Sequence, residues 1–524
     1  MVRLIRKKHL VVIILLGILL FHFFNNFIWL KKDNRIDGPD SGWHLIESVK
    51  FYLAFKKILY STESFFAKTE HSIQAFGHWP TGNWPPLIYF LSALINPHEF
   101  SLFRIRMYLN FIFYILLILS TYFLGKKCFN RRVGLIAAFL ISFYPAVCAF
   151  SRQFGLDFPL FCLTATCVCL LVYAENFSKR GYSLLFGLSL GIAMLVKLQI
   201  LFFLLMPLLY IISSIFSEKN SEKLKAILNL ILSLTVAFIL FYLYWGNKLG
   251  FIFSNFYEHA FTLYPFYTGK RTPALGPSTI PVFSLRNITF YLEGLLYYVS
   301  LFPFILFVCA LVAILVSKNK WRLFFLLSLL VPYFIITFIS VKWTRYALPL
   351  LVFMAVITAW SIDSLRLRYL KVVILCALVF NSMRLCFFNS WTINRLPYVP
   401  CRFFQTTIKD SVFPRLYPPD PYDYTRELEK DGVIPHIEQG LRDGKKIRIE
   451  FGGDSVEVNV ALLYIYFQDD IFNNRIDIRS RMKLDFQDVD YIVLRSTDLL
   501  NKKELLKNYM ILSRAGECVV LIKK

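Results

Sequence analysis

The chain has 524 residues, of which 57% are hydrophobic and 18% aromatic, and its formal net charge is +24. The apolar residues form repeated runs of at least about 18 residues, which a bilayer core of roughly 30 Å requires and a soluble core does not. A soluble globular protein is therefore excluded. The charge does not indicate a nucleic-acid partner, because much of it lies in short loops between the apolar runs and the rest is spread along loops and tail.

In chain order, the apolar runs predict a polytopic α-helical membrane protein with about eleven spanning helices. The runs cover residues 10–30, 104–124, 133–150, 156–174, 182–197, 199–216, 226–246, 291–316, 322–340, 346–361 and 371–389. The first run follows a basic start, as in a signal peptide, but it is long and lacks a small-residue cleavage site. We expect it to be retained as an anchor.

Lysine and arginine residues gather in every second loop. They are Arg3, Arg6, Lys7 and Lys8; Lys126, Lys127, Arg131 and Arg132; Lys179 and Arg180; Lys219, Lys223 and Lys225; Lys318, Lys320 and Arg322; and Arg366, Arg368 and Lys371. Positively charged short loops remain on the cytoplasmic side. We therefore expect a multi-pass protein of the cell membrane with a cytoplasmic N-terminus and with residues 31–103, 247–290 and 390–524 outside.

The first outward region, 31–103, is too long to be a plain connector. Residues 43–59 mix apolar side chains with Glu47, Lys50, Lys56 and Lys57, which predicts an amphipathic helix lying on the membrane surface. The apolar segment 85–95 that follows is shorter than a span, so we expect it to dip into the membrane or lie flat on it.

The second outward region, 247–290, contains Pro265, Pro273, Pro277 and Pro281. Proline at this density disfavours regular helix, and long loops of this kind are usually lids or binding loops, so we interpret the region as a cover over the site.

Glu258 and His259 lie in the same region and, with the outward His44 and His78, could ligate a divalent metal ion. They lack a compact metal-binding spacing such as His-Glu-x-x-His. Solvated loop side chains are the alternative, and no cofactor follows from the sequence.

From about residue 390 the composition becomes that of a soluble domain. Residues 446–451 and 490–494 alternate apolar and polar side chains, which predicts strands, and residues 423–430 and 502–509 predict helices. The expected domains are therefore a transmembrane module, 1–390, and a small extracytoplasmic α/β domain, 391–524. Cys401 and Cys518 lie in this domain and either form a disulfide or remain thiols.

Asp40 follows the first apolar run immediately, in Asp37-Gly38-Pro39-Asp40-Ser41-Gly42-Trp43-His44. A carboxylate just outside a spanning helix places chemistry at the membrane surface, where it can accept a proton from a hydroxyl group. The alternative is that Asp40 caps the helix that begins near Gly42.

Asp157 lies near the outer end of the fourth run, a few residues after Arg152. It could bind a metal, position Arg152 or hold a substrate, and the alternative is again a helix cap.

Lys197 lies between two apolar runs, and Arg345 precedes Tyr346 at the start of another. A cation at that depth either binds an anion or extends to the interface, and arginine can hold a phosphate with two hydrogen bonds while Tyr346 adds a hydroxyl donor.

The order of these features resembles the GT-C membrane glycosyltransferases of the protein O-mannosyltransferase and aminoarabinose-transferase type over residues 1–390. The matching positions are Asp40; Trp84-Pro85-Pro86-Leu87; Arg104 or Arg106; Tyr144-Pro145; Ser151-Arg152 and Asp157; Gly187, Gly191 and Lys197; and Arg345-Tyr346-Ala347-Leu348-Pro349. The resemblance implies inverting transfer of a sugar from a polyprenyl-phosphate carrier in the membrane to an extracytoplasmic acceptor: a protein, a lipid or an envelope glycan. It implies catalytic roles for Asp40 and Asp157 and substrate binding by Arg152, Lys197, Arg345 and Tyr346.

One position departs from the family pattern, which usually has Asp-Glu where this chain has Asp40-Ser41. The role of the second carboxylate must be met elsewhere or be absent. Two other functions therefore stay open: a transporter or flippase of a lipid-linked precursor, and a catalytically silent scaffold. The candidate charges lie at the outer ends of the runs, whereas transporters usually place them at the midplane, which favours surface chemistry. The sugar and the acceptor do not follow from the sequence.

Overall fold

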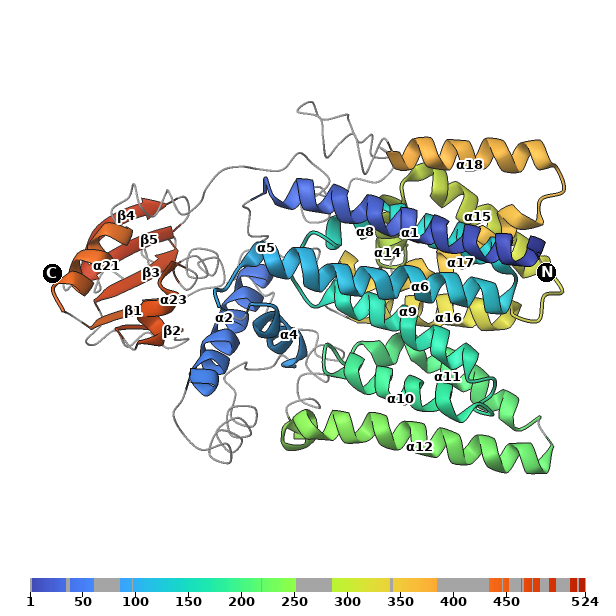
Figure 1. The fold of residues 1–524 in the computed structure, drawn as a ribbon, viewed down its shortest axis with the longest axis horizontal. Helices are drawn as coiled ribbons and strands as arrows, with labels where there is room; N and C mark the ends of the chain where they lie inside the picture. Colours follow the sequence, from blue (N-terminus) through green and yellow to red (C-terminus); the bar gives the residue numbers. More distant parts are fainter. Residues whose placement is uncertain are drawn as a thin grey trace.

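The computed structural model of the chain describes residues 2–33, 38–60, 85–96, 98–217, 219–250, 285–339, 343–383, 433–444, 446–451, 463, 466–473, 475–480, 490–495, 509–515 and 518–523. These residues form a large helical bundle followed by a small five-stranded sheet (Figure 1). The class expected from the sequence, a polytopic helical protein with a small C-terminal α/β region, is confirmed.

The helices follow the apolar runs closely. They are α1 (Val2–Leu30), α2 (Gly38–Tyr60), α4 (Leu87–Ile95), α5 (Leu102–Arg104), the π-helix η1 (Ile105–Leu109), α6 (Asn110–Cys128), α7 (Arg131–Phe143), α8 (Pro145–Phe150), α9 (Asp157–Tyr173), α10 (Arg180–Met194), α11 (Ile200–Ile215), α12 (Asn220–Trp245), the 3-10 helix η2 (Gly246–Lys248), α14 (Leu285–Val299), α15 (Leu301–Val316), α16 (Arg322–Phe338), the 3-10 helix η4 (Thr344–Ala347), α17 (Leu350–Ser364) and α18 (Arg368–Ser382). Within the described residues, three helical segments are long and apolar enough to cross a membrane: His9–Leu30, Leu102–Cys128 and Asn220–Trp245. Five shorter apolar helices accompany them, and the number of eleven spans stays a prediction.

Two of the apolar runs were expected to form single helices, and the structure divides each of them into two. Run 133–150 divides into α7 and α8 because Tyr144 is extended, with φ −62° and ψ 131°, before Pro145. Proline disfavours helical conformation in the residue before it, so the break has a local cause. Run 291–316 divides into α14 and α15 at Ser300, whose φ of 70° lies in the left-handed region. Each break turns the chain inside the bundle.

Helix α17 forms the centre of the bundle. The side chains of residues 350–357 are all fully buried, so the helix is covered on every side. A helix that is apolar all round is stable only when other elements surround it. Helices α7, α15 and α16 pack against α17, which fixes the position of η4 immediately before it.

Helices α10 and α12 approach each other closely through glycine. A Cβ atom on Gly187 would lie 2.1 Å from the carbonyl oxygen of Ser233, and one on Gly191 would lie 2.6 Å from Leu240. Two hydrogen bonds join α12 to the loop before α10 and to the end of α10: Asn229 Nδ2 donates to Phe177 O at 2.7 Å, and Trp245 Nε1 donates to Met194 O at 3.2 Å. The Gly-x-x-x-Gly spacing thus serves helix packing.

The C-terminal sheet has the strand order β2-β1-β3-β5-β4. Its strands are β1 (Ile447–Phe451), β2 (Ile476–Ser480), β3 (Tyr491–Arg495), β4 (Tyr509–Ala515) and β5 (Cys518–Lys523), accompanied by α21 (Val433–Arg442) and α23 (Gln468–Phe472). Strand β1 pairs parallel with β2 and β3, and β5 pairs antiparallel with β3 and β4. The strands expected at 446–451 and 490–494 are confirmed as β1 and β3. The helix expected at 423–430 and residues 502–508 lie outside the described part of the chain, and Tyr509 begins β4.

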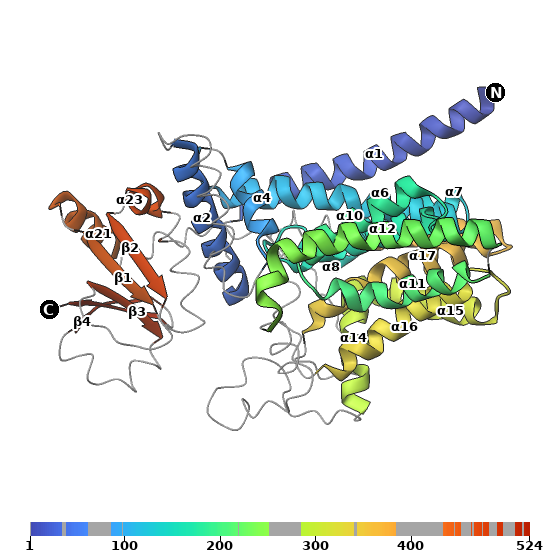
Figure 2. The ribbon, with the colours of Figure 1, turned by 90° about the horizontal axis from the view of Figure 1, so that it is seen from below.

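The sheet region lies beside α2 in both views (Figure 1, Figure 2). Lys56 Nζ of α2 donates a hydrogen bond to Asp469 Oδ1 of α23 at 2.9 Å. The backbone N–H of Phe100 donates to Gln468 Oε1 at 3.1 Å. The helix that carries Asp40 at its start is therefore in contact with the C-terminal domain at its other end.

Candidate active site

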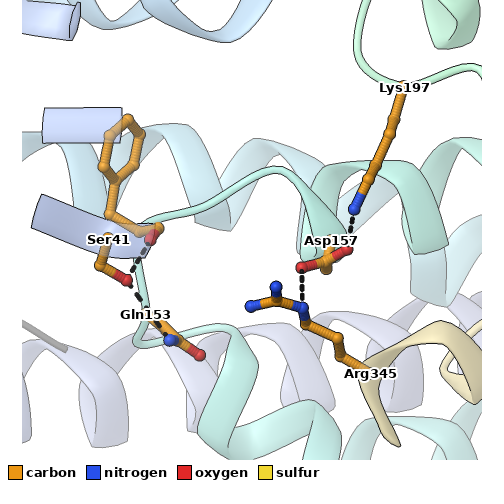
Figure 3. Close-up of polar contacts among 6 residues, drawn as sticks. Ser41, Gln153, Asp157, Lys197 and Arg345 are labelled. Carbon is orange, nitrogen blue, oxygen red and sulfur yellow. Dashed lines mark hydrogen bonds and ion pairs between the residues drawn. The ribbon is translucent and has the colours of Figure 1, made fainter. Parts of the chain in front are cut away.

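Asp157 joins three elements that are distant in sequence. It is the first residue of α9, where a carboxylate also interacts favourably with the helix dipole. Its Oδ1 accepts a hydrogen bond from Lys197 Nζ at 2.8 Å, and its Oδ2 lies 3.2 Å from Arg345 Nε (Figure 3). Lys197 comes from the turn between α10 and α11, and Arg345 from η4. Three of the residues expected at the site thus meet at one point.

The three described side chains of the cluster are one anion and two cations, so together they carry an excess positive charge. The side chains of Lys197, Asp157 and Arg345 keep 11%, 15% and 23% of their surface exposed. Aromatic rings hold both cations: Lys197 Nζ lies 5.3 Å from the centre of the Tyr346 ring, and the Arg345 guanidinium lies 4.4 Å from that of Trp343. A partly exposed pair of cations held in this way suits an anionic ligand.

The start of α2 is tied to the loop that leads to Asp157. Ser41 Oγ donates a hydrogen bond to the carbonyl oxygen of Phe154 at 3.0 Å, and Gln153 Nε2 donates to Ser41 Oγ at 3.4 Å (Figure 3). Ser41 is therefore a tether between two parts of the site. Asp40 precedes it in the first turn of α2, and the side chain of Asp40 lies outside the described part of the chain.

The sequence interpretation did not select Glu47 or Tyr89. Positions 40, 44 and 47 lie on one face of α2, because residues four and seven apart in a helix share a face. His44 Nδ1 and Tyr89 Oη of α4 are 2.8 Å apart, and His44 lies within electrostatic range of Asp157. Glu47 is fully buried one turn further along. The spacing from Asp40 was the available signal, but burial by α4 could not be read from it.

Glu47 has two different carboxylate oxygens. Its Oε1 accepts a hydrogen bond from Lys50 Nζ at 2.9 Å, whereas Oε2 is buried with no hydrogen-bond partner among the described residues. Burial raises the pKa of the Glu47 carboxyl, and the Lys50 ammonium only partly offsets this effect. A buried carboxyl in this state can accept and release a proton near the site.

The described side-chain contacts of Arg152 are with α1. Its side chain is fully buried, its Nε donates to Asn26 Oδ1 at 2.9 Å, and its guanidinium lies 4.8 Å from the centre of the Trp29 ring. Both partners belong to α1, so these contacts join the Arg152 side chain to α1, and substrate binding by Arg152 stays a prediction.

The two arginines that match one family position also differ in their surroundings. Arg106 lies in the π-helix η1 and forms a buried ion pair with Asp33 at 3.6 Å. Arg104 Nη1 donates to the carbonyl oxygen of Glu99 at 3.2 Å. Arg106 thus joins the end of α1 to the start of α6.

No three His, Cys, Asp or Glu side chains gather into a metal-binding group within the described ranges. Glu258, His259 and His78 lie outside those ranges, as does Cys401, so neither the metal site nor the disulfide can be compared.

Residues 83–245 match the family model described as "Dolichyl-phosphate-mannose-protein mannosyltransferase". No curated protein matches the sequence. The fold is similar to that of ArnT from Cupriavidus metallidurans in the apo state, with a TM-score of 0.59, 14% identity and 97% of each chain covered. The structure of ArnT from the same organism bound to undecaprenyl phosphate gives a TM-score of 0.57, again with 14% identity and 97% of each chain covered.

The Archaeoglobus fulgidus oligosaccharyltransferase, tethered with an acceptor peptide, gives a TM-score of 0.50 and 13% identity, covering 92% of this chain and 69% of that one. The expected resemblance in fold is confirmed.

Proposed function

Since this is a membrane protein with the GT-C glycosyltransferase fold, we propose that it transfers a sugar from a polyprenyl-phosphate carrier to an acceptor on the outer side of the membrane. The observation that carries the proposal is the meeting of Lys197 and Arg345 on Asp157 at one end of the bundle. The ArnT structure with undecaprenyl phosphate supports a carrier of this class.

Lys197 and Arg345 bind the carrier phosphate in this proposal. Both cations are held by aromatic rings and by one carboxylate, so they are oriented before the donor arrives. Preorganised cations stabilise the charge that develops on the leaving phosphate without a cost of reorganisation. Asp157 positions the two cations and keeps their mutual repulsion low.

Asp40 acts as the general base. It removes the proton from the acceptor hydroxyl, whose oxygen attacks the anomeric carbon from the face opposite the phosphate. The bond between that carbon and the phosphate oxygen breaks, and the phosphate leaves with the electron pair and the negative charge. One displacement of this kind inverts the configuration of the sugar.

Glu47 is the carboxylate that we assign to the role left vacant by Ser41. It lies on the same face of α2 as position 40 and interacts electrostatically with Tyr89, the partner of His44, and one of its oxygens has no partner among the described residues. We place it as a positioning residue that acts electrostatically on Tyr89 and, through Tyr89, on His44.

The decisive experiment measures the release of polyprenyl phosphate by the purified protein. Wild type should release it in the presence of an acceptor, and Asp40→Asn should lose about 10² to 10⁴ in rate while binding the donor and unfolding at the wild-type temperature. Equal release by Asp40→Asn would remove Asp40 as the base. Movement of intact carrier lipid across vesicle membranes without release of polyprenyl phosphate would indicate a flippase. Absence of both activities would indicate a scaffold.

We also propose the cytoplasmic N-terminus and the outer C-terminal domain, because basic loops alternate along the chain. A cysteine introduced at the exposed Gln439 of α21, in a background without the native cysteines, should react with an impermeant maleimide in intact cells. Reaction only after permeabilisation would reverse the orientation.

A further inference from the structure

Asn110 lies at the junction of two helices, inside the bundle. Its backbone N–H donates a hydrogen bond to the carbonyl oxygen of Ile105, which closes the wider turn of the π-helix η1, and the residue then begins α6. Asn110 is only 1% exposed. A buried amide is costly unless it forms hydrogen bonds, so the partners of its side chain indicate what it does.

The Asn110 amide holds residues 151–156, the segment between α8 and α9. Its Nδ2 donates to the carbonyl oxygen of Ser151 at 3.0 Å and to that of Gln153 at 2.7 Å. An amide nitrogen has two protons, so both are used on this segment. Asn26 of α1 also holds the segment, because its Nδ2 donates to Ser151 Oγ at 3.0 Å. Residues 151–156 form turns and bends and no helix or strand, so these side-chain bonds fix the path of the segment.

Gln153 connects this segment to the start of α2. Its carbonyl oxygen accepts from Asn110, and its Nε2 donates to Ser41 Oγ at 3.4 Å. Ser41 Oγ in turn donates to Phe154 O at 3.0 Å (Figure 3). Ser41 follows Asp40 directly in the first turn of α2. Asn110, Gln153 and Ser41 therefore form a continuous polar path from α6 to the residue beside Asp40.

The polar path supplies a constraint that the packing of α2 does not. Helix α2 packs against α4, but apolar contacts are non-directional and define the rotation of a helix about its axis less sharply than hydrogen bonds do. The bonds of Ser41 therefore fix the rotation of α2 at the end where Asp40 lies. A small rotation there would change the direction in which position 40 faces.

We propose that Asn110 is a positioning residue for Asp40 and acts through Gln153 and Ser41. The inference rests on the proposed role of Asp40 as general base and extends it to a buried amide on another helix. We expect an effect on kcat, because the orientation of the base changes. The donor KM should change little, because the cations assigned to the carrier phosphate are held by other contacts.

The first test measures release of polyprenyl phosphate by the purified full chain, with the sugar-loaded undecaprenyl phosphate that wild type uses in the release assay. Asn110→Ala should lower kcat at least about tenfold, since a misplacement of about 1 Å can cost on the order of 10²-fold. Gln153→Met keeps a half-buried side chain of similar length and removes its polar group. It should lower kcat about fivefold with the donor KM unchanged, and it serves the test even if Asn110→Ala is too unstable to assay. Wild-type kcat in Gln153→Met would overturn the proposal.

Asn229→Ala is the matched control. Asn229 is also buried, and its Nδ2 donates to a loop carbonyl, that of Phe177, at 2.7 Å. Phe177 follows the end of α9 opposite Asp157, so the bond is remote from the site. The variant should lose stability and keep kcat. A fall in kcat as large as that in Asn110→Ala would overturn the proposal, because the effect would then be one of stability.

A double-mutant cycle tests whether Asn110 acts through Ser41. The double variant Ser41→Ala/Asn110→Ala should lose little more in kcat than Asn110→Ala alone, because both changes break the same path. Ser41→Ala combined with Asn229→Ala should give the product of the two single effects. Independent losses in the first pair would overturn the proposal.

Hydrogen exchange followed by mass spectrometry tests the same path without substrate. The amides of residues 42–47 in α2 should exchange faster in Asn110→Ala and Gln153→Met than in wild type, and at the wild-type rate in Asn229→Ala. Unchanged exchange in the first two variants would overturn the proposal whether or not the protein transfers sugar. A wild-type protein that releases no polyprenyl phosphate would instead reject the proposed function, so the two failures can be told apart.

Discussion

Lys197 Nζ lies 2.8 Å from Asp157 Oδ1, although the two residues are 40 positions apart and belong to different elements. Arg345 reaches the other oxygen of the same carboxylate from η4. The Asp157 side chain therefore positions both cations that we assign to the carrier phosphate. A change at Asp157 should affect both the stability of the fold and the binding of the donor.

Arg345→Lys should raise the donor KM about tenfold, because the ammonium keeps the charge but loses the planar group that holds two phosphate oxygens. Arg345→Ala should raise it further, with the unfolding temperature nearly unchanged. Steady-state kinetics with varied donor measure both. Arg104→Lys is the matched control, since Arg104 contacts a backbone carbonyl on the same side of the bundle. Wild-type donor kinetics in Arg345→Lys, with a loss of stability in Arg345→Ala, would make Arg345 an interfacial anchor and leave Lys197 as the phosphate ligand.

Asp157→Asn should lower the free energy of unfolding by about 1–3 kcal/mol, because it leaves two neighbouring cations without their shared anion. Undecaprenyl phosphate should restore much of this loss, since its phosphate replaces the missing charge and a ligand at 100 times its Kd stabilises by about 2.7 kcal/mol. Thermal unfolding with and without the lipid measures the effect. A lipid-induced shift no larger than that of wild type would separate Asp157 from the donor site.

Glu47→Gln tests the buried carboxyl through its pH dependence. The folded-state pKa of Glu47 is raised from its ordinary value of 4.5 by burial. Its stabilising contribution is therefore fully present below pH 4.5 and is lost as the pH rises through the raised value. Glutamine stays neutral, so the unfolding temperature of the variant should fall less than that of wild type between pH 4.5 and 7.5.

The same variant should transfer sugar more slowly at pH 7.5 if the Glu47 charge positions the His44–Tyr89 pair. Glu99→Gln, at an exposed position, should follow wild type in both measurements. Parallel stability curves for Glu47→Gln and wild type would contradict the effect of burial, and an unchanged rate would remove Glu47 from the site.

Gly187→Ala should destabilise the pair α10–α12, because the added Cβ would lie 2.1 Å from the carbonyl oxygen of Ser233 and one helix must move. Overpacking of this kind costs about 1–3 kcal/mol. Gly181→Ala is the control within the same helix, since nothing lies within 4 Å of its Cβ position. Gly181→Ala should keep or raise the unfolding temperature measured by fluorescence, because alanine has the higher helix propensity and restricts the unfolded chain. An equal fall in both variants would show that the cost in Gly187→Ala does not arise from the close approach.

Helix positions followed from the sequence because long apolar runs are a property of consecutive residues. The break at Tyr144 had a visible cause in Pro145, whereas nothing in the local pattern marks the left-handed Ser300. A left-handed serine persists only when the packing on both sides requires it, and that packing depends on residues distant in the chain.

The site was predictable in part for a similar reason. Asp157, Lys197 and Arg345 were selected one by one from their charge and their place at the ends of apolar runs, but their pairing is tertiary. Arg152 satisfied the same criteria, and its packing against Trp29 could not be predicted because the path of α1 is not encoded near residue 152. In the sequence, Glu47 is one of several charged residues on a predicted amphipathic helix. Its burial became visible only in the structure, where α4 packs against α2.

The contact between Lys56 and Asp469 joins α2 to the C-terminal domain through a surface ion pair in which Asp469 is 75% exposed. Pairs of this kind are worth about 0.2–1 kcal/mol and weaken with salt. The same interface contains the buried hydrogen bond from the Phe100 backbone to Gln468 and apolar side chains that belong to one core with the bundle, and these contacts are not screened by salt. Ionic strength should therefore change the interface between the C-terminal domain and the helix that carries Asp40 only slightly.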